Sequence, residues 1–302
     1  MGEDGGAMRA RLLILAVLFA SAACDRKAPS GGVAPASASA SAVPSDVKLP
    51  TSRSTTPVPS GALVVVLSPT RVAVDRDGAT LAVPDPATWD KGLDAKYKMG
   101  SRNDFRVLPL QAALEARRIG DAGLPTVAVD ADASLPYRSL FEALYTIGQN
   151  GGDRISLVVR NGADVGAINL AAPHPEAHLL RVGDLHGDSG RAPTEPGSRF
   201  DLLVIVTADG FLVSAAGQRI ATGCNEPGTG VAVPKHDGVF DYASLTVCVA
   251  RLKALSPDFA AETHVKVGAA FAIDTQTLVS AIDALRGGDT PLLPNVELAV
   301  PN

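Results

Sequence analysis

The chain has 302 residues, of which 46% are hydrophobic, 20% charged and only 4% aromatic, and its formal net charge is −5. The hydrophobic content is sufficient for compact cores, which must be built mainly from Val, Leu, Ile and Ala. The negative charge, with no run of Lys or Arg, excludes a nucleic-acid-binding face, because such a face needs a basic patch. The length favours two domains, at roughly 150 residues each.

Residues 1–24 are typical of a signal peptide. A basic stretch at residues 8–11 precedes the apolar residues 12–20, and small residues lead directly to Cys24. About a dozen apolar residues are too few to span a bilayer, which takes roughly 20. Small residues before a cysteine resemble a bacterial lipobox, so we expect lipid attachment at Cys24; an ordinary secretory signal is the alternative. Asp25 resembles an inner-membrane retention signal of enteric lipoproteins, so we expect a periplasmic protein anchored by lipid to the inner membrane.

Residues 25–60 are mostly Ala, Ser, Pro, Gly and Thr. Such a composition buries too little apolar surface to offset the cost of ordering. We therefore expect a flexible tether between the anchor and the first folded domain.

A first domain is predicted over residues 61–162. An apolar strand at 63–67 is followed by a hairpin over 71–83, a polar insertion at 84–104 and a short amphipathic helix from Pro109. A strand at 126–129 then leads to a helix that starts near Pro136, ends at the glycines 151–152 and is followed by a strand at 155–159. A strand–helix–strand unit this short favours parallel pairing with a right-handed crossover.

The same order of elements returns over residues 200–302, after a linker at 163–199 that contains a candidate strand at 166–171. The apolar run at 202–206 follows that at 63–67 by 139 residues, and Val265 follows Val127 by 138. The helical positions Leu278 and Val279 follow Leu140 and Phe141 by 138. We therefore predict an α/β (α+β) fold with two tandem small domains, each a mixed sheet of four to five strands with two helices on one face. One larger domain with generic α/β alternation is the alternative.

Two cysteines remain if Cys24 carries lipid. In an exported protein an even pair favours a disulfide, so we predict a bond between Cys224 and Cys248. Two buried free thiols are the alternative. Cys248 lies on the same helical face as Leu245 and Val249, and therefore points inward in either case.

The stretch around residues 127–159 resembles the periplasmic domain of the ExbD/TolR family of biopolymer-transport proteins. The resemblance lies in a strand ending in Ala131-Asp132, a short loop, Tyr137 at the start of a helix, the turn at Gly151-Gly152 and a final apolar strand. It covers residues 63–159 apart from the insertion, and residues 201–300 are similar as a diverged copy, with Gly268-Ala269-Ala270 in place of Ala131-Asp132. The resemblance implies a periplasmic module beside inner-membrane motor proteins of the ExbB/TolQ type, without catalytic residues. Family members carry a transmembrane helix with a proton-conducting aspartate, whereas residues 12–23 here contain no carboxylate.

Asp132 and Tyr137 each allow two interpretations. Asp132 could contact a partner or the cell wall, but an Asp between a strand and a helix more often hydrogen-bonds loop amides or caps the helix. For Tyr137, core packing with the hydroxyl at the rim is the expected role.

A sequence at residues 183–188, Gly-Asp-Leu-His-Gly-Asp, is similar to the metal-binding opening of calcineurin-type phosphoesterases. Asp184 and His186 could ligate a divalent metal, and His174 and His178 lie nearby. The further motifs that such enzymes need are missing from the sequence, and there is no Gly-x-Ser-x-Gly, Walker loop or Cys-x-x-Cys. We therefore expect neither an enzyme nor a bound metal or cofactor, with a metal-dependent phosphoesterase as the minor alternative.

The sequence thus predicts a non-catalytic envelope lipoprotein that acts as a binding component of a biopolymer-transport or envelope-tethering complex. The expected partners are ExbB/TolQ-like motor proteins or other envelope proteins. A peptidoglycan- or self-binding structural module without a motor partner is the alternative. The two domains are also candidates to pair with each other as a covalent pseudo-dimer.

Overall fold

The computed structural model describes residues 43–44, 46–75, 80–82, 92–100, 104–118, 123–173, 200–287 and 292–300, which belong to one compact unit. The predicted signal peptide, Cys24 and Asp25 lie outside the described residues. So does the segment from 174 to 199, which contains Asp184, His186, His174 and His178.

The first half of the unit follows the predicted order of elements. Its elements are β1 (Leu63–Ser68), β2 (Arg71–Val74), β3 (Thr80–Ala82), a short 3-10 turn (Ala95–Tyr97), α1 (Leu108–Glu115), β4 (Val127–Ala131), α2 (Tyr137–Gln149), β5 (Arg154–Asn161) and β6 (Asp164–Ala171). Helix α1 has Pro109 in its first turn, and α2 starts directly after Pro136, as expected for a residue that favours helix N-termini.

The second half repeats much of this order. Its elements are β7 (Leu203–Thr207), β8 (Gly210–Ala215), β9 (Gln218–Arg219), β10 (Val233–Pro234), α3 (Tyr242–Lys253), α4 (Pro257–Ala261), β11 (His264–Ala269), α5 (Thr275–Arg286) and β12 (Asn295–Leu298). Asp241 and Asp274 begin α3 and α5 by accepting hydrogen bonds from backbone N–H groups of the first turn. Strand β10 and helix α4 were not anticipated from the sequence.

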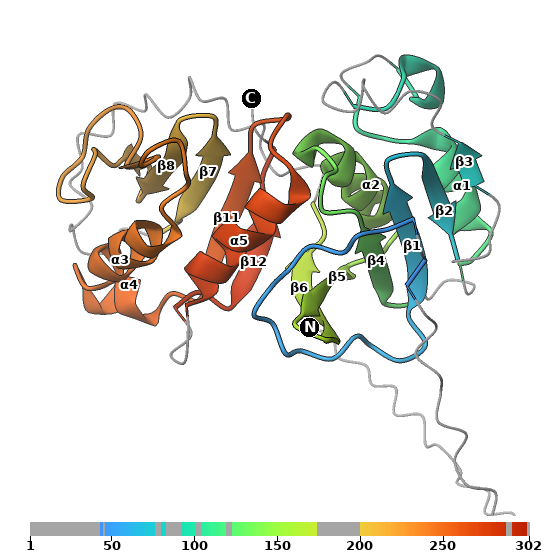
Figure 1. The fold of residues 1–302 in the computed structure, drawn as a ribbon, viewed down its shortest axis with the longest axis horizontal. Coiled ribbons are helices and arrows are strands. Elements are labelled where there is room, and N and C mark those ends of the chain that lie inside the picture. The colour runs from blue at the N-terminus through green and yellow to red at the C-terminus, as the bar shows by residue number, and fades with distance from the viewer. Residues whose placement is uncertain are drawn as a thin grey trace, which may run out of the picture. The chain divides into compact units, whose positions relative to one another are not determined.

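The strands of both halves form one mixed sheet rather than the two separate sheets expected. The strand order is β10-β8-β7-β11-β12-β6-β5-β4-β1-β2-β3, with β9 paired to β8. The two halves meet where β6 lies beside β12 (Figure 1), in parallel register at Val296 with Leu170 and Glu297 with Ala171. The segment predicted as linker supplies this junction, because β6 pairs with β5 through one edge and leaves the other edge to β12.

One apolar core continues through both halves. It includes the inward-facing residues of the central strands together with the buried faces of α2 and α5, and these two helices contact each other. The low aromatic content is reflected in this core, which is mainly Val, Leu, Ile and Ala.

Residues 46–58, here called the strap, differ from the predicted flexible tether. Val47 and Leu49 are buried against Val66, Ala128 and Val158, on the face of β1, β4 and β5 opposite to α2. The few apolar residues of this Pro- and Ser-rich segment thus pack against a specific part of the sheet. The average composition of residues 25–60 did not predict this packing, because it depends on single residues.

Candidate binding site

The family-like loop after β4 is held by its own aspartate. The carboxylate of Asp132 accepts hydrogen bonds from the Ser134 backbone N–H at 2.9 Å and the Ser134 hydroxyl at 2.6 Å. Its other oxygen accepts from the backbone N–H of Lys48 in the strap, at 2.7 Å. Asp132 therefore bonds to loop amides, as the structural interpretation expected, but it does not cap α2, which starts at Pro136 without a side-chain cap.

Tyr137 differs from the expectation that its hydroxyl lies at the rim. The side chain is fully buried, and its Oη donates to the backbone carbonyl of Ala299 at 2.6 Å. Burial raises the pKa of this phenol well above its usual value, so the hydroxyl keeps its proton. The first residue of α2 thus connects the first half to the chain segment that follows β12.

The loops before α2 and α5 exchange backbone hydrogen bonds in a reciprocal pattern. The Thr275 N–H donates to the carbonyl of Leu135 at 2.8 Å, and the Tyr137 N–H donates to the carbonyl of Ile273 at 2.6 Å. Ile273 lies 138 residues after Leu135, and Thr275 lies 138 residues after Tyr137. The contact is therefore isologous within one chain, as across the axis of a two-fold dimer.

A second pair of bonds extends this reciprocal contact. Gln276 N–H donates to the Ala133 carbonyl at 2.9 Å, and Arg138 N–H donates to the Phe271 carbonyl at 3.2 Å. These residues obey the same offset of 138. We call residues 133–138 and 271–276 together the seam.

The strap passes from the first half to α5 of the second. Gln276 accepts from the Thr51 N–H at 2.7 Å and donates to the Thr51 carbonyl at 3.0 Å. Asp283 accepts from the Ser52 hydroxyl at 2.8 Å and from the Arg53 N–H at 2.9 Å. The strap therefore holds α5 against the first half. The sequence pattern did not single out Gln276 or Asp283, the two side chains that make these contacts.

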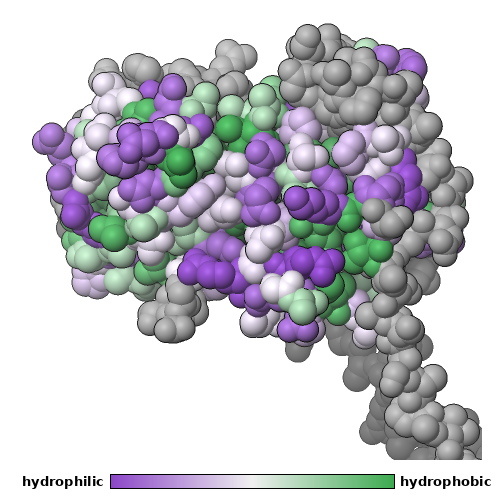
Figure 2. All heavy atoms as spheres, viewed as in Figure 1, coloured by the Kyte–Doolittle hydropathy of each residue, from purple (hydrophilic) through white to green (hydrophobic). Residues whose placement is uncertain are grey.

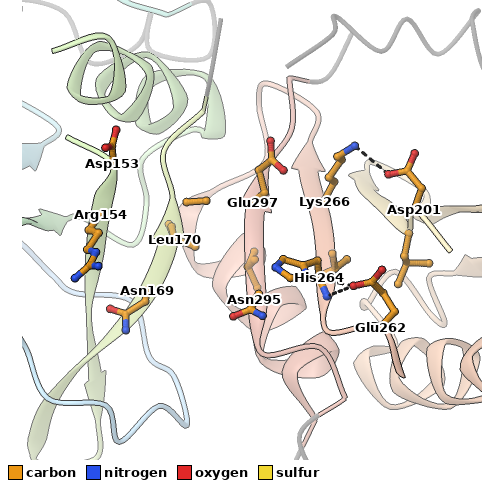
Figure 3. A pocket seen from close by; sticks show the side chains of 14 residues that line it. Asp153, Arg154, Asn169, Leu170, Asp201, Glu262, His264, Lys266, Asn295 and Glu297 are labelled. Atoms are coloured by element: carbon orange, nitrogen blue, oxygen red, sulfur yellow. Dashed lines mark hydrogen bonds and ion pairs between the residues drawn. The ribbon is translucent and has the colours of Figure 1, made fainter. Parts of the chain in front are cut away.

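A groove of about 390 Å³, lined by both charged and apolar residues, lies at the junction of the two halves (Figure 3). On β11 and β12, polar residues alternate with core residues, so they face the side of the sheet opposite to the apolar core. The side chains that give the groove its chemistry are Arg154, Asn169, His264, Lys266, Asn295 and Glu297. The alternation of polar and apolar residues along β11 and β12 is visible in the sequence. The sequence does not show that these polar residues lie close to those of β5 and β6.

An ion pair and a set of hydrogen bonds fix one wall of this groove. Lys266 contacts Asp201 at 2.9 Å, and Glu262 accepts from the His264 backbone N–H at 2.9 Å, with its carboxylate 3.1 Å from the His264 ring. Burial acts to raise the pKa of Glu262, but the hydrogen bonds from His264 and Thr263 outweigh it and hold the pKa below its usual value. The groove thus offers both charge signs and amides to a ligand.

A buried charge cluster fastens the insertion to α2. Glu142 contacts Lys98 Nζ and Arg138 Nε, each at 2.5 Å, and accepts from the Leu93 N–H at 2.9 Å. Burial lowers the pKa of Lys98, although the nearby Glu142 carboxylate opposes this effect. The Arg138 guanidinium also lies over the rings of Phe105 and Phe271, at 4.4 and 4.5 Å, so the cluster reaches the second half.

The cysteine prediction is confirmed. Cys224 and Cys248 form a disulfide, with their Cα atoms 5.4 Å apart, and it ties the loop after β9 to α3. Within the described residues, no group of three His, Cys, Asp or Glu side chains could hold a metal ion. In the same part of the chain, no helix has both the length and the apolar character needed to cross a bilayer.

The family model for the biopolymer transport protein ExbD/TolR matches residues 33–162. This segment is an ExbD/TolR family domain. It contains the strap, Asp132, Tyr137 and the elements β1 to β5, and it ends before β6. No significant match was found among curated proteins or among solved structures. The chain therefore carries a domain of an envelope-associated family related to biopolymer transport, as the resemblance predicted.

Proposed function

We propose that the protein is a non-catalytic binding component of an envelope complex for biopolymer transport. The ExbD/TolR domain over residues 33–162 is the observation that carries this proposal. Lipid attachment at Cys24 would hold the folded unit at the membrane surface, and the partners would be motor proteins of the ExbB/TolQ type. The absence of a carboxylate between residues 12 and 23 argues against a proton-conducting role.

We further propose that residues 200–302 are a diverged second copy of the ExbD/TolR domain, and that the two copies form a covalent pseudo-dimer. The constant offset of 138 residues in the seam supports this, since each hydrogen bond has its counterpart in the other half. The single sheet that continues across β6 and β12 is consistent with the same arrangement.

The proposal is tested by purifying the tagged protein from its own membranes and identifying what accompanies it. Wild type should recover a motor protein of the ExbB/TolQ type, and Cys24→Ala should move the protein out of the membrane fraction and lose that partner. An Asp258→Ala variant, changed at an exposed position of α4, is the matched control. Recovery of only unrelated cytoplasmic proteins would contradict the proposal.

Peptidoglycan binding without a motor partner is the second candidate, and the groove at the junction favours it. Peptidoglycan stem peptides carry amide, carboxylate and amino groups, for which the groove has Asn169, Glu297 and Arg154. In a sedimentation assay with purified cell wall, wild type should pellet and Arg154→Glu should pellet much less. Lys96→Glu, at an exposed site outside the groove, should behave as wild type; equal pelleting of all three would exclude the groove as the site.

A further inference from the structure

A second cavity, of about 370 Å³, lies in the half outside the family match, between α3 and the chain around β10. Its volume falls in the range of about 300–1,000 Å³ that is usual for ligand pockets. The Cys224–Cys248 disulfide joins the two walls, because Cys224 belongs to the loop and Cys248 to the helix. The disulfide therefore ties the loop wall of the cavity covalently to the helix wall.

Two cations at this cavity have only neutral partners among the described residues. Lys235 Nζ lies 4.1 Å from the centre of the Phe240 ring, and Arg251 donates to the carbonyl of Gly223 at 2.8 Å and to the side chain of Asn225. Neither makes an ion pair with a described carboxylate, unlike Arg71 or Lys266 elsewhere in the unit. Both could therefore pair with an incoming carboxylate without breaking an existing ion pair.

The acidic residue in the lining is already engaged. One oxygen of Asp241 accepts from the Ser244 N–H at 2.8 Å and the other accepts from the Ser244 hydroxyl at 2.7 Å, so this carboxylate serves to start α3. His236 is turned toward solvent, with its ring 3.6 Å from Asp237. The charge left for a ligand at the lining is consequently positive.

Exposed aliphatic side chains lie next to these cations. Val247, in the cavity lining, is 57% exposed, and Val239, in the turn that follows His236, is 68% exposed. On the face shown in Figure 2, hydrophobic residues lie in small groups between hydrophilic ones over the part that carries α3 and α4. A ligand that covers Val247 while meeting Lys235 and Arg251 must combine aliphatic and carboxylate groups.

We propose that this cavity is a docking site for an acidic segment of another protein, in which Glu or Asp residues alternate with aliphatic ones. The carboxylates would pair with Lys235 and Arg251, and an aliphatic side chain would pack on Val247. This site is separate from the groove at the junction and does not depend on the ExbD/TolR domain for its residues.

The probe is a fluorescein-labelled hexapeptide, Glu-Leu-Glu-Val-Glu-Leu, added to the purified full-length protein while fluorescence anisotropy is recorded. The Glu peptide should bind, and peptides with Gln or Lys in place of Glu should bind more weakly or not at all. Raising the salt to about 1 M should also weaken binding, because the screening length falls to about 3 Å.

Variants assign the binding to the cavity. Lys235→Gln and Arg251→Gln should each lower the affinity for the Glu peptide by up to about fivefold. This is the amount expected for the loss of one exposed charge pair. Val247→Glu adds a carboxylate at an exposed position, so it should fold normally and abolish binding by repulsion. Lys96→Gln, a change of the same charge in the first half, should leave affinity unchanged. The proposal is overturned if the Glu peptide does not bind, if the three peptides bind equally, or if Val247→Glu binds as wild type.

Discussion

The Tyr137 hydroxyl donates a hydrogen bond of 2.6 Å to the carbonyl of Ala299, across a sequence separation of 162 residues. Both groups are buried, so the bond joins the ExbD/TolR domain to the second half in a place that water does not reach. Together with the reciprocal backbone bonds of the seam, it makes the two halves depend on each other.

Tyr137→Phe removes this donor and leaves the Ala299 carbonyl without it. We expect the free energy of unfolding to fall by about 1–3 kcal/mol, the usual cost of an unsatisfied buried polar group. Urea denaturation of the purified wild type and variant measures this difference in the free energy of unfolding. Tyr97→Phe, at a partly exposed tyrosine of the insertion, should change stability by less than about 0.5 kcal/mol. Equal effects of the two variants would contradict the role assigned to the buried hydroxyl.

Glu142→Gln should lower the free energy of unfolding more than Tyr137→Phe does. It leaves Lys98 and Arg138 buried without their shared carboxylate, and breaking a buried ion pair in this way costs about 3–5 kcal/mol. Glu115→Gln on the exposed side of α1 is the control, with an expected change within about 0.5 kcal/mol. A loss below about 1 kcal/mol for Glu142→Gln would show that the cluster does not fasten the insertion.

Asp283→Ala should release the strap from α5 without unfolding the unit. The carboxylate holds the Ser52 hydroxyl and the Arg53 N–H, and each such bond contributes about 0.5–1.5 kcal/mol. Hydrogen exchange of residues 46–56 should therefore accelerate by roughly tenfold, while β4 and β5 keep their protection. If the strap amides exchange at the wild-type rate, Asp283 does not hold the strap, and its attachment rests on its other contacts, such as those of Val47, Leu49 and Thr51.

Asp241 gives a pH-dependent prediction. The hydrogen bond from the Ser244 N–H, followed by that from the Ser244 hydroxyl, lowers the pKa of this carboxyl below 3.8. A folded-state pKa below the unfolded one adds stability above the unfolded pKa, and this stability is lost as the pH falls through the folded pKa. Asp241→Ala should therefore cost about 1 kcal/mol at neutral pH and progressively less below pH 3.8. A penalty independent of pH would contradict the role of the charged cap.

Much of the fold could be predicted because its signals are local. Helix α2 follows from apolar residues at helical spacing between Pro136 and the glycines 151–152, and the strands from short apolar runs between turn residues. The disulfide followed from counting cysteines in a chain whose sequence predicts export.

The junction could not be predicted, because it depends on contacts between distant segments. Nothing local to β6 indicates that its free edge pairs with β12, and nothing in a Pro-rich segment indicates that Thr51 meets Gln276. The groove has the same origin: Arg154 and His264 each look like ordinary surface residues until the two halves join.

The most direct test of the pseudo-dimer is the mass of the purified protein in solution, measured by light scattering after size exclusion. If the second half already occupies the place of a partner domain, the protein should elute as a single chain, with a mass of at most the 30.9 kDa of all 302 residues. A stable homodimer of twice that mass would contradict the account.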